Sequence, residues 1–139
     1  MNGTFVIDNS VVMAWCFGDE AGAYADAVLD KLSSHTAVVP AIWPLEVVNV
    51  LLAAERRQRL KPADSVRFLT LLSALPIVVD PDHGGRKTMM KDLLVLGRER
   101  TLSSYDAAYL DLAMRNDCPI ATQDKKLLEA ARAVDVPVI

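Results

Sequence analysis

Short apolar runs alternate along the chain with longer segments in which apolar residues recur at helical spacing. Four runs predict strands, with a further edge strand at the end: Thr4 to Ile7, Ala37 to Val39, Ile77 to Val79, Cys118 to Thr122 and Val136 to Ile139. The periodic segments predict helices starting near Val11 and spanning Glu20 to Leu32, Pro44 to Gln58, Pro62 to Ala74, Lys87 to Arg98, Ser103 to Arg115 and Lys125 to Val134. Strands that alternate with helices favour a parallel sheet, because each parallel pair needs a crossover. We therefore predict an α/β fold with α/β/α layers and a central parallel sheet of four to five strands.

The segment from Ala37 to Ala54 is apolar or proline except at Glu46 and Asn49. Its prolines and polar residues argue against a membrane span, so we interpret it as a buried strand followed by a helix. An ionised carboxylate in apolar surroundings costs several kcal/mol unless a cation or hydrogen-bond donors meet it. Glu46 is therefore predicted to have a functional role, and Asn49, one helical turn later, can orient it or meet the same ligand.

Composition and charge limit the number of domains, the cellular location and the class of partner that the chain can have. The 139 residues are 52% hydrophobic and 24% charged, which fits one globular domain over residues 1–139. No secretory signal pattern is visible, so a cytoplasmic location is expected. Cys16 and Cys118 lack metal-type spacing and are interpreted as buried, reduced thiols. The net charge of −3 does not indicate a nucleic-acid binder. Basic residues nevertheless gather in two clusters, which are either candidate phosphate contacts or solvated helix faces. The first cluster is Arg56, Arg57, Arg59 and Lys61, and the second is Arg86, Lys87 and Lys91.

Four acids stand at or near the carboxyl ends of predicted strands, where parallel sheets place their ligand crevice. Asp8 follows the first strand, Glu46 lies early in the helix after the second, Asp124 follows the fourth, and Asp106 begins the helix leading into the fourth. Helix capping is the alternative for three of them. Asp8 and Asp124 have positions typical of N-caps, and Ser103 with Asp106 matches a capping box.

Carboxylates that cluster without compensation repel one another, and a bound divalent cation relieves that repulsion. Ligands made only of carboxylate oxygens suit Mg²⁺ or Mn²⁺, whereas zinc normally recruits His or Cys, and His35 and His83 are not expected to be ligands. Such a site typically catalyses phosphoryl transfer or phosphodiester hydrolysis. The chain has no G-x-S-x-G, Walker A or G-x-G-x-x-G motif that would favour another class.

Four segments together resemble the PIN-domain ribonucleases, especially the VapC-type toxins of toxin–antitoxin modules: FVIDNSV with Asp8, PLEVVNVLLAA with Glu46, LSSYDAAYLDLA with Asp106, and IATQDKKLLEAA with Asp124. The resemblance implies a PIN-like fold, endoribonuclease activity with Mg²⁺ or Mn²⁺, a homodimer and an antitoxin that blocks the site. It also implies that these four acids bind the metal, and that Ser10 and Thr122 hold a ligand acid, a water or the scissile phosphate. Some relatives carry another acid after the last aspartate, where this chain has Lys125 and Lys126, so a second tightly held metal is in doubt.

Three other classes remain open on sequence alone. A phosphatase of the haloacid dehalogenase type also has an aspartate after the first strand, but it needs a second aspartate where this chain has Ser10. A receiver domain would use Asp80 as phosphoacceptor and leaves Glu46 unexplained. A non-catalytic RNA- or partner-binding module would use the acids as helix caps. If RNA is the substrate, Arg56, Arg57, Arg86, Lys87 and Lys125 are the candidates for backbone contacts.

Overall fold

The computed structural model describes residues 3–18, 22–81 and 86–139 of the chain. Its strands are β1 (Thr4–Ile7), β2 (Thr36–Val39), β3 (Ile77–Val79) and β4 (Ile120–Ala121). Its helices are α1 (Asn9–Ala14), α2 (Ala23–Lys31), α3 (Trp43–Arg56), α4 (Pro62–Ser73), α5 (Met89–Arg100), α6 (Ser104–Asn116) and α7 (Lys125–Ala133). The predicted alternation of strands and helices is thereby confirmed.

The four strands form one parallel sheet in the order β3-β2-β1-β4. Val6 stands opposite Val38 of β2 on one side and Ile120 of β4 on the other. A fifth strand does not form among the described residues, where Val138 makes only an isolated bridge to Ile120. Pro137 has no N–H to donate, so the final segment cannot continue a ladder of backbone hydrogen bonds.

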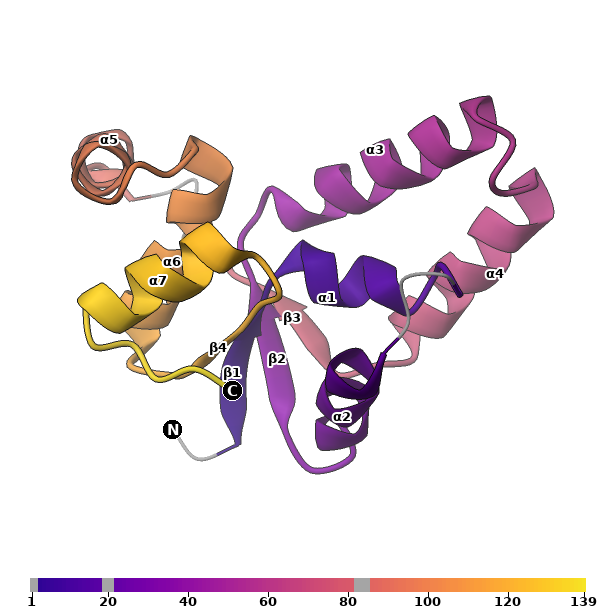
Figure 1. The fold of residues 1–139 in the computed structure, drawn as a ribbon, viewed down its shortest axis with the longest axis horizontal. Helices are drawn as coiled ribbons and strands as arrows, with labels where there is room; N and C mark the ends of the chain where they lie inside the picture. The colour runs from indigo at the N-terminus through magenta and orange to yellow at the C-terminus, as the bar shows by residue number, and fades with distance from the viewer. Residues whose placement is uncertain (1–2, 19–21, 82–85) are drawn as a thin grey trace.

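The strand order decides where a ligand crevice lies. The chain steps from β1 to β2 to β3 in one direction, and then returns across the sheet to β4. Because such crossovers are right-handed, α1 to α4 lie on one side of the sheet and α5 and α6 on the other, and Figure 1 shows this division. The neighbouring strands β1 and β4 therefore mark the switch point, where open α/β sheets bind ligands beyond the carboxyl ends of their strands.

Several boundaries differ from the predicted ones for local reasons. Helix α1 begins at Asn9 instead of Val11, directly after the extended Asp8. Strand β4 is shorter than predicted because the Cys118 N–H bonds the carbonyl of Ala113 at the end of α6. The predicted helix start at Glu20 lies outside the described residues, as does His83.

The buried core is formed by the strands together with one face of each surrounding helix. The apolar run that continues from β2 into α3 contributes to it. Helix α3 turns its buried side chains to this core: Trp43, Val47, Leu51 and Ala54. No disulfide joins Cys16 and Cys118; Cys118 is buried as predicted, whereas Cys16 is half-buried. Among residues 3–18, 22–81 and 86–139 we find no helix with the length and apolar character needed to cross a membrane.

Candidate metal centre at the switch point

Asp8 lies at the centre of the candidate site, directly beyond β1. Its backbone N–H bonds the carbonyl of Ala121 at 2.9 Å, which fixes it against the end of β4. The residue is only 6% exposed, and its Oδ2 accepts hydrogen bonds from the hydroxyls of Ser10 and Thr122, each at 2.8 Å. Asp8 occupies the N-cap position of α1, but its side chain makes no cap hydrogen bond. The cap interpretation is therefore wrong for Asp8, because its carboxylate turns to these hydroxyls instead.

The loop after β4 is tied to the same carboxylate. Thr122 Oγ1 also accepts a hydrogen bond from the Asp124 N–H at 3.0 Å, so one hydroxyl connects the two acids. Asp124 Oδ1 accepts from the Leu127 N–H at 3.1 Å, which confirms its predicted role as the N-cap of α7. That bond uses one carboxylate oxygen, so capping does not exclude a further ligand.

Glu46 lies in the first turn of α3 and is half-buried. Its Oε1 accepts a hydrogen bond of 2.6 Å from the hydroxyl of Tyr109, which is itself only 1% exposed. The polar partner expected near Glu46 is thus a neutral phenol rather than a cation. Burial, followed by the bond to Glu46, raises the pKa of Tyr109, which stays protonated and acts as the donor. Asn49 is exposed on the same side of α3, where it lines a hollow together with Glu46.

Asp106 enters the site from α6, on the opposite side of the sheet from α3. Its backbone N–H donates to the hydroxyl of Ser103 at 3.1 Å, so Ser103 is the N-cap of this helix. This bond is one half of the predicted capping box. The other half, a bond from the Ser103 backbone N–H to the Asp106 carboxylate, does not form between these two residues. Burial raises the pKa of the half-buried Asp106 carboxylate, the charges of Asp8 and Asp124 raise it further, and the interaction with the Ser103 side chain lowers it.

The four acids influence one another electrostatically although they come from four separate parts of the sequence. Burial is the main cause that raises the pKa of Asp8, Glu46 and Asp106. Neighbouring carboxylates raise these pKa values further: Asp124 acts on Asp8, both Asp8 and Asp106 act on Glu46, and both Asp8 and Asp124 act on Asp106. Their charged forms are therefore destabilised by the protein alone, a condition that a cation relieves.

The donor chemistry of this cluster fits a hard divalent cation, because carboxylate and hydroxyl oxygens are the ligands that Mg²⁺ and Mn²⁺ prefer. The geometry is more open than a formed coordination shell. Within the described part of the chain, no three His, Cys, Asp or Glu side chains are placed to hold a metal ion together. Binding a cation would require the carboxylates to draw closer to one another.

Tyr24 and Tyr109 are polar contributors to this region that the sequence analysis did not identify. The hydroxyl of Tyr24 accepts from the Thr122 N–H at 3.1 Å and donates to the carbonyl of Ile139 at 3.0 Å. For Tyr109, one signal was available, since it follows Asp106 by three residues and so shares its side of the helix. Tyr24 lies 98 residues from Thr122, and no local pattern indicates such a contact.

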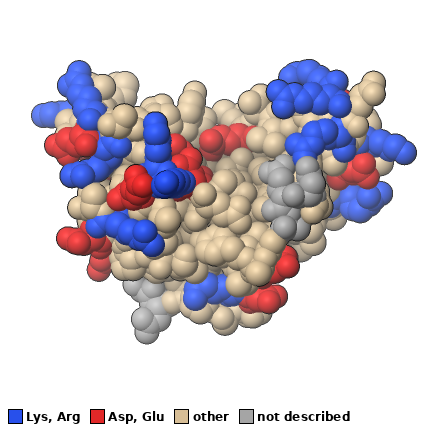
Figure 2. All heavy atoms as spheres, in the orientation of Figure 1, with Lys and Arg blue, Asp and Glu red and all other residues tan. Residues whose placement is uncertain are grey.

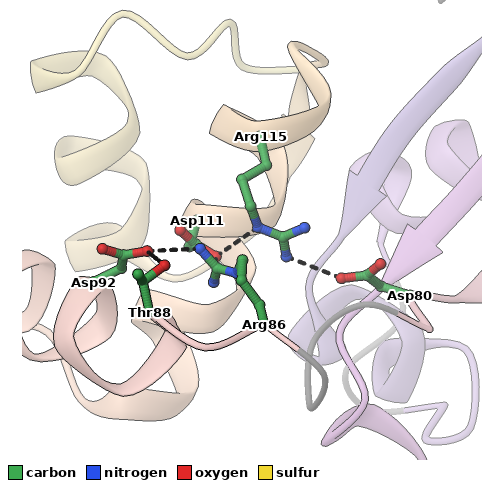
Figure 3. A network of polar contacts seen from close by, with 6 residues as sticks. All are labelled: Asp80, Arg86, Thr88, Asp92, Asp111 and Arg115. Atoms are coloured by element: carbon green, nitrogen blue, oxygen red, sulfur yellow. Dashed lines mark hydrogen bonds and ion pairs between the residues drawn. The ribbon is translucent and has the colours of Figure 1, made fainter.

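The basic candidates divide into two groups. Arg56, Arg57, Lys87 and Lys125 are exposed. Figure 2 shows acidic atoms in the hollow between the α3–α4 arm and the side formed by α5 to α7, with Lys and Arg atoms on both flanks. Arg86 differs, because its guanidinium pairs with Asp92 at 2.8 Å and Asp111 at 2.7 Å (Figure 3). Its charge serves to hold α5 and α6 together.

Asp80 belongs to the same network and does not form a receiver-type phosphorylation site. It is 7% exposed and accepts a hydrogen bond of 2.9 Å from Arg115, which also contacts Asp111 (Figure 3). A phosphoacceptor has to meet solvent and a metal, whereas this carboxylate is buried against a guanidinium. The network instead fixes the end of β3 to α6, the helix that supplies Asp106 and Tyr109.

Comparisons with known proteins agree with this architecture. No curated protein matches the chain in sequence. One similar solved structure is the crystal structure of PAE2754 from Pyrobaculum aerophilum, at 22% sequence identity and a TM-score of 0.68. The match covers 99% of this chain and 87% of that chain, and at this identity it bears on the fold alone. The sequence pattern of the PIN domain family matches residues 5–133, a span that includes all four acids. The chain therefore belongs to the PIN domain family, whose members are generally nucleases.

Proposed function

We propose that this chain is a Mg²⁺- or Mn²⁺-dependent endoribonuclease that hydrolyses RNA phosphodiester bonds. The observation that carries the proposal is the gathering of acids at the β1–β4 switch point, where the Thr122 hydroxyl connects Asp8 to Asp124, and where burial and then neighbouring carboxylates raise the pKa of Asp8, Glu46 and Asp106. Helix capping explains the N-cap bond of Asp124 but not the inward-facing carboxylates of Asp8 and Glu46. Membership of the PIN domain family supports nuclease chemistry over the phosphatase and the purely binding alternatives.

Asp8, Glu46, Asp106 and Asp124 would hold the cation in this proposal. When bound, the cation supplies an activated water and neutralises charge on the phosphate. Ser10 and Thr122 orient Asp8 through their hydrogen bonds to its Oδ2. Because that oxygen already accepts two bonds, Asp106 is the better candidate than Asp8 to take the proton from the attacking water. Asn49 lies beside Glu46, in reach of the same phosphate or water.

The exposed basic residues would contact the RNA backbone. Phosphate contacts position a nucleic acid without reading its sequence, and Arg56, Arg57, Lys87 and Lys125 offer the charge for that task. Arg86 does not enter this part of the proposal, because two carboxylates already bind its guanidinium.

The resemblance to VapC-type toxins extends the proposal to biological context. In that setting the chain forms a homodimer, acts in the cytoplasm on cellular RNA, and is held inactive by a cognate antitoxin. Expression of the chain alone should then arrest growth, and Asp106→Asn should relieve the arrest. A growth defect that persists at equal expression of the variant would contradict a toxin that acts through this site.

Cleavage of RNA tests the activity directly. The purified chain should cut total RNA in the presence of Mg²⁺ or Mn²⁺ and not in EDTA. Asp8→Asn and Asp106→Asn should each lower the rate by roughly 10²-fold or more. Asp30→Asn, at an exposed acid on α2, is the matched control and should cut normally.

A thermal-shift experiment separates metal binding from catalysis. Mn²⁺ at about 100 times its Kd should stabilise the wild-type chain by roughly 2.7 kcal/mol. Asp106→Asn should lose most of this stabilisation while Asp30→Asn keeps it. An equal Mn²⁺ effect in all three proteins would show that the cation binds elsewhere and would refute the proposed centre.

A further inference from the structure

A second hollow adjoins the acids on the α1 side, away from Glu46. It measures about 480 Å³, within the size range of small-ligand sites. The residues of its lining that matter here are Asn9, Ser10, Phe17, Arg59, Gln123 and Asp124. Ser10 connects this hollow to the acids, because its hydroxyl donates to Asp8 at 2.8 Å and accepts from the Gln123 N–H at 3.4 Å. A group in this hollow would therefore lie next to a phosphate bound at the acids.

Asn9, one of the lining residues, carries a buried side-chain oxygen that lacks a hydrogen-bond partner within the described part of the chain. The residue is 8% exposed, and among the described residues its Oδ1 has no hydrogen-bond partner. A buried acceptor without a partner is unfavourable, and buried polar groups are normally satisfied by protein, water or a ligand. Gln123 adds an exposed amide side chain to the same lining. Two amides offer the paired donors and acceptors that recognise the edges of nucleic-acid bases.

Arg59 and Phe17 supply a flat surface in the same hollow. The guanidinium carbon of Arg59 lies 4.3 Å from the centre of the Phe17 ring, so the cation stacks on the aromatic face. Phe17 is buried, which anchors the stack to the core, while Arg59 is exposed. Guanidinium planes and aromatic rings are the groups on which proteins stack unpaired bases.

The hollow on the Glu46 side has a different lining. Around Glu46 and Asn49 it is mainly apolar, with exposed side chains of Leu45, Val48 and Leu52. Such a surface can pack against any base but has few groups with which to distinguish one base from another. Base recognition is therefore assigned to the Asn9 side of the acids.

We propose that the hollow between Asn9, Arg59 and Gln123 binds the base of the nucleotide next to the scissile phosphate and sets the cleavage preference. The proposal rests on the ribonuclease function and names the part of the substrate that this site reads. The base stacks on the Arg59 guanidinium, and its edge meets the amides of Asn9 and Gln123. Arg59 thus contributes to base specificity as well as to the positive charge that attracts RNA.

Binding of free nucleosides tests this assignment without metal or catalysis. Adenosine, guanosine, cytidine and uridine are titrated into the ¹⁵N-labelled full chain in EDTA. One or two nucleosides should shift the backbone amides of Ser10, Phe17 and Gln123 more than the others do. Gln123→Ala and Arg59→Ala should weaken that binding severalfold, whereas Arg67→Ala, which removes an exposed arginine of α4, should not. Equal shifts with all four nucleosides, shifts confined to the Glu46 side, or no shifts would overturn the proposal.

Sequencing the ends of cleaved RNA tests the same residues during turnover. Gln123→Ala should relax the preference at one position beside the cut by roughly tenfold, as expected for the loss of a base contact. Gln58→Ala, at an exposed residue just after α3, is the matched control and should leave the preference unchanged. An unchanged preference in Gln123→Ala and Arg59→Ala would refute the base site while leaving the nuclease intact. Selective nucleoside binding without any RNA cleavage would instead refute the ribonuclease function.

Discussion

Tyr109 shows how a single residue can belong to the core and still serve the candidate site. Its ring is buried in α6, while its hydroxyl donates to Glu46 across 63 residues of sequence. Glu46 therefore has one oxygen fixed by the protein, which limits the directions in which the other oxygen can point. Hydrogen bonds of this kind around metal ligands often matter nearly as much as the ligands themselves.

We predict that Tyr109→Phe weakens metal binding more than it weakens the fold. Loss of the hydroxyl should raise the Kd for Mn²⁺ roughly tenfold, because Glu46 is no longer held. The free energy of unfolding should fall by only about 1 kcal/mol, since the ring still fills the core. Mn²⁺ titration followed by thermal unfolding measures both quantities. Tyr105→Phe, on an exposed ring of the same helix, is the control, and an equal Kd in both variants would contradict the role of Tyr109.

At the level of elements, the residue that caps the C-terminus of α5 has a backbone conformation that is unfavourable for its residue type. Thr101 has φ 55° and ψ 48°, the left-handed region in which β-branched residues are strained. Gly97 permits this ending, because the Cβ of any other residue there would lie 3.1 Å from the carbonyl of Leu102. The turn then leads into Ser103 and the start of α6, so it sets where Asp106 begins its helix.

Thr101→Gly should consequently stabilise the protein. Relief of the left-handed strain outweighs the greater chain entropy of glycine in the unfolded state, with a net gain of roughly 0.5–1 kcal/mol. Urea unfolding measures the change. Thr70→Gly, in the interior of α4, makes the same substitution in an ordinary helical conformation and should instead destabilise. A loss of stability in Thr101→Gly would show that its threonine makes a compensating contact.

Helix α6 is also held at its other end by the arginine network of Figure 3. Arg115→Met should lower the free energy of unfolding by about 2 kcal/mol, because Asp80 and Asp111 lose a cation while they are largely buried. Arg67→Met removes an exposed pair with Asp64 and should cost less than about 1 kcal/mol. Chemical unfolding of the two variants gives the comparison. A similar loss of unfolding free energy in both variants would mean that burial does not strengthen the ion pairs of Arg115.

For the whole molecule, the coupled acids make stability depend on pH in a definite direction. The pKa of Asp106 is raised in the folded protein, first by burial and then by Asp8 and Asp124. The folded state thus holds this proton more tightly than the unfolded chain does. The resulting stabilisation is fully present below the ordinary aspartate pKa and is lost as pH rises through the raised pKa.

Asp106→Asn removes this titration. In EDTA, the stability of the variant relative to the wild type should therefore increase as pH rises. The two proteins should differ little near about pH 4, and by about pH 8 the variant should be the more stable of the two. Thermal unfolding across this range measures the difference. Asp30→Asn should follow the wild type throughout. A gap between Asp106→Asn and the wild type that does not change with pH would show that charge coupling is not its cause.

Sequence alone determined the features that depend on neighbours along the chain. Alternating apolar runs and helical periods predicted the four parallel strands and seven helices, because both patterns express which face of a segment is buried. Glu46 was singled out because its immediate neighbours are apolar, and Asp124 was correctly predicted as a helix cap. The capping alternative failed for Asp8 because a distant partner decided the outcome: its carboxylate bonds Thr122 instead of capping α1.

Only the tertiary structure decided which side chains meet. It connects Tyr109 to Glu46, Tyr24 to Thr122 and Arg115 to Asp80, contacts that span 35 to 98 residues and follow no local period. It also places the acids of four elements at the β1–β4 switch point, within electrostatic reach of one another. A linear pattern specifies the faces of helices and strands, whereas long-range charge and hydrogen bonding depend on how those faces pack in three dimensions.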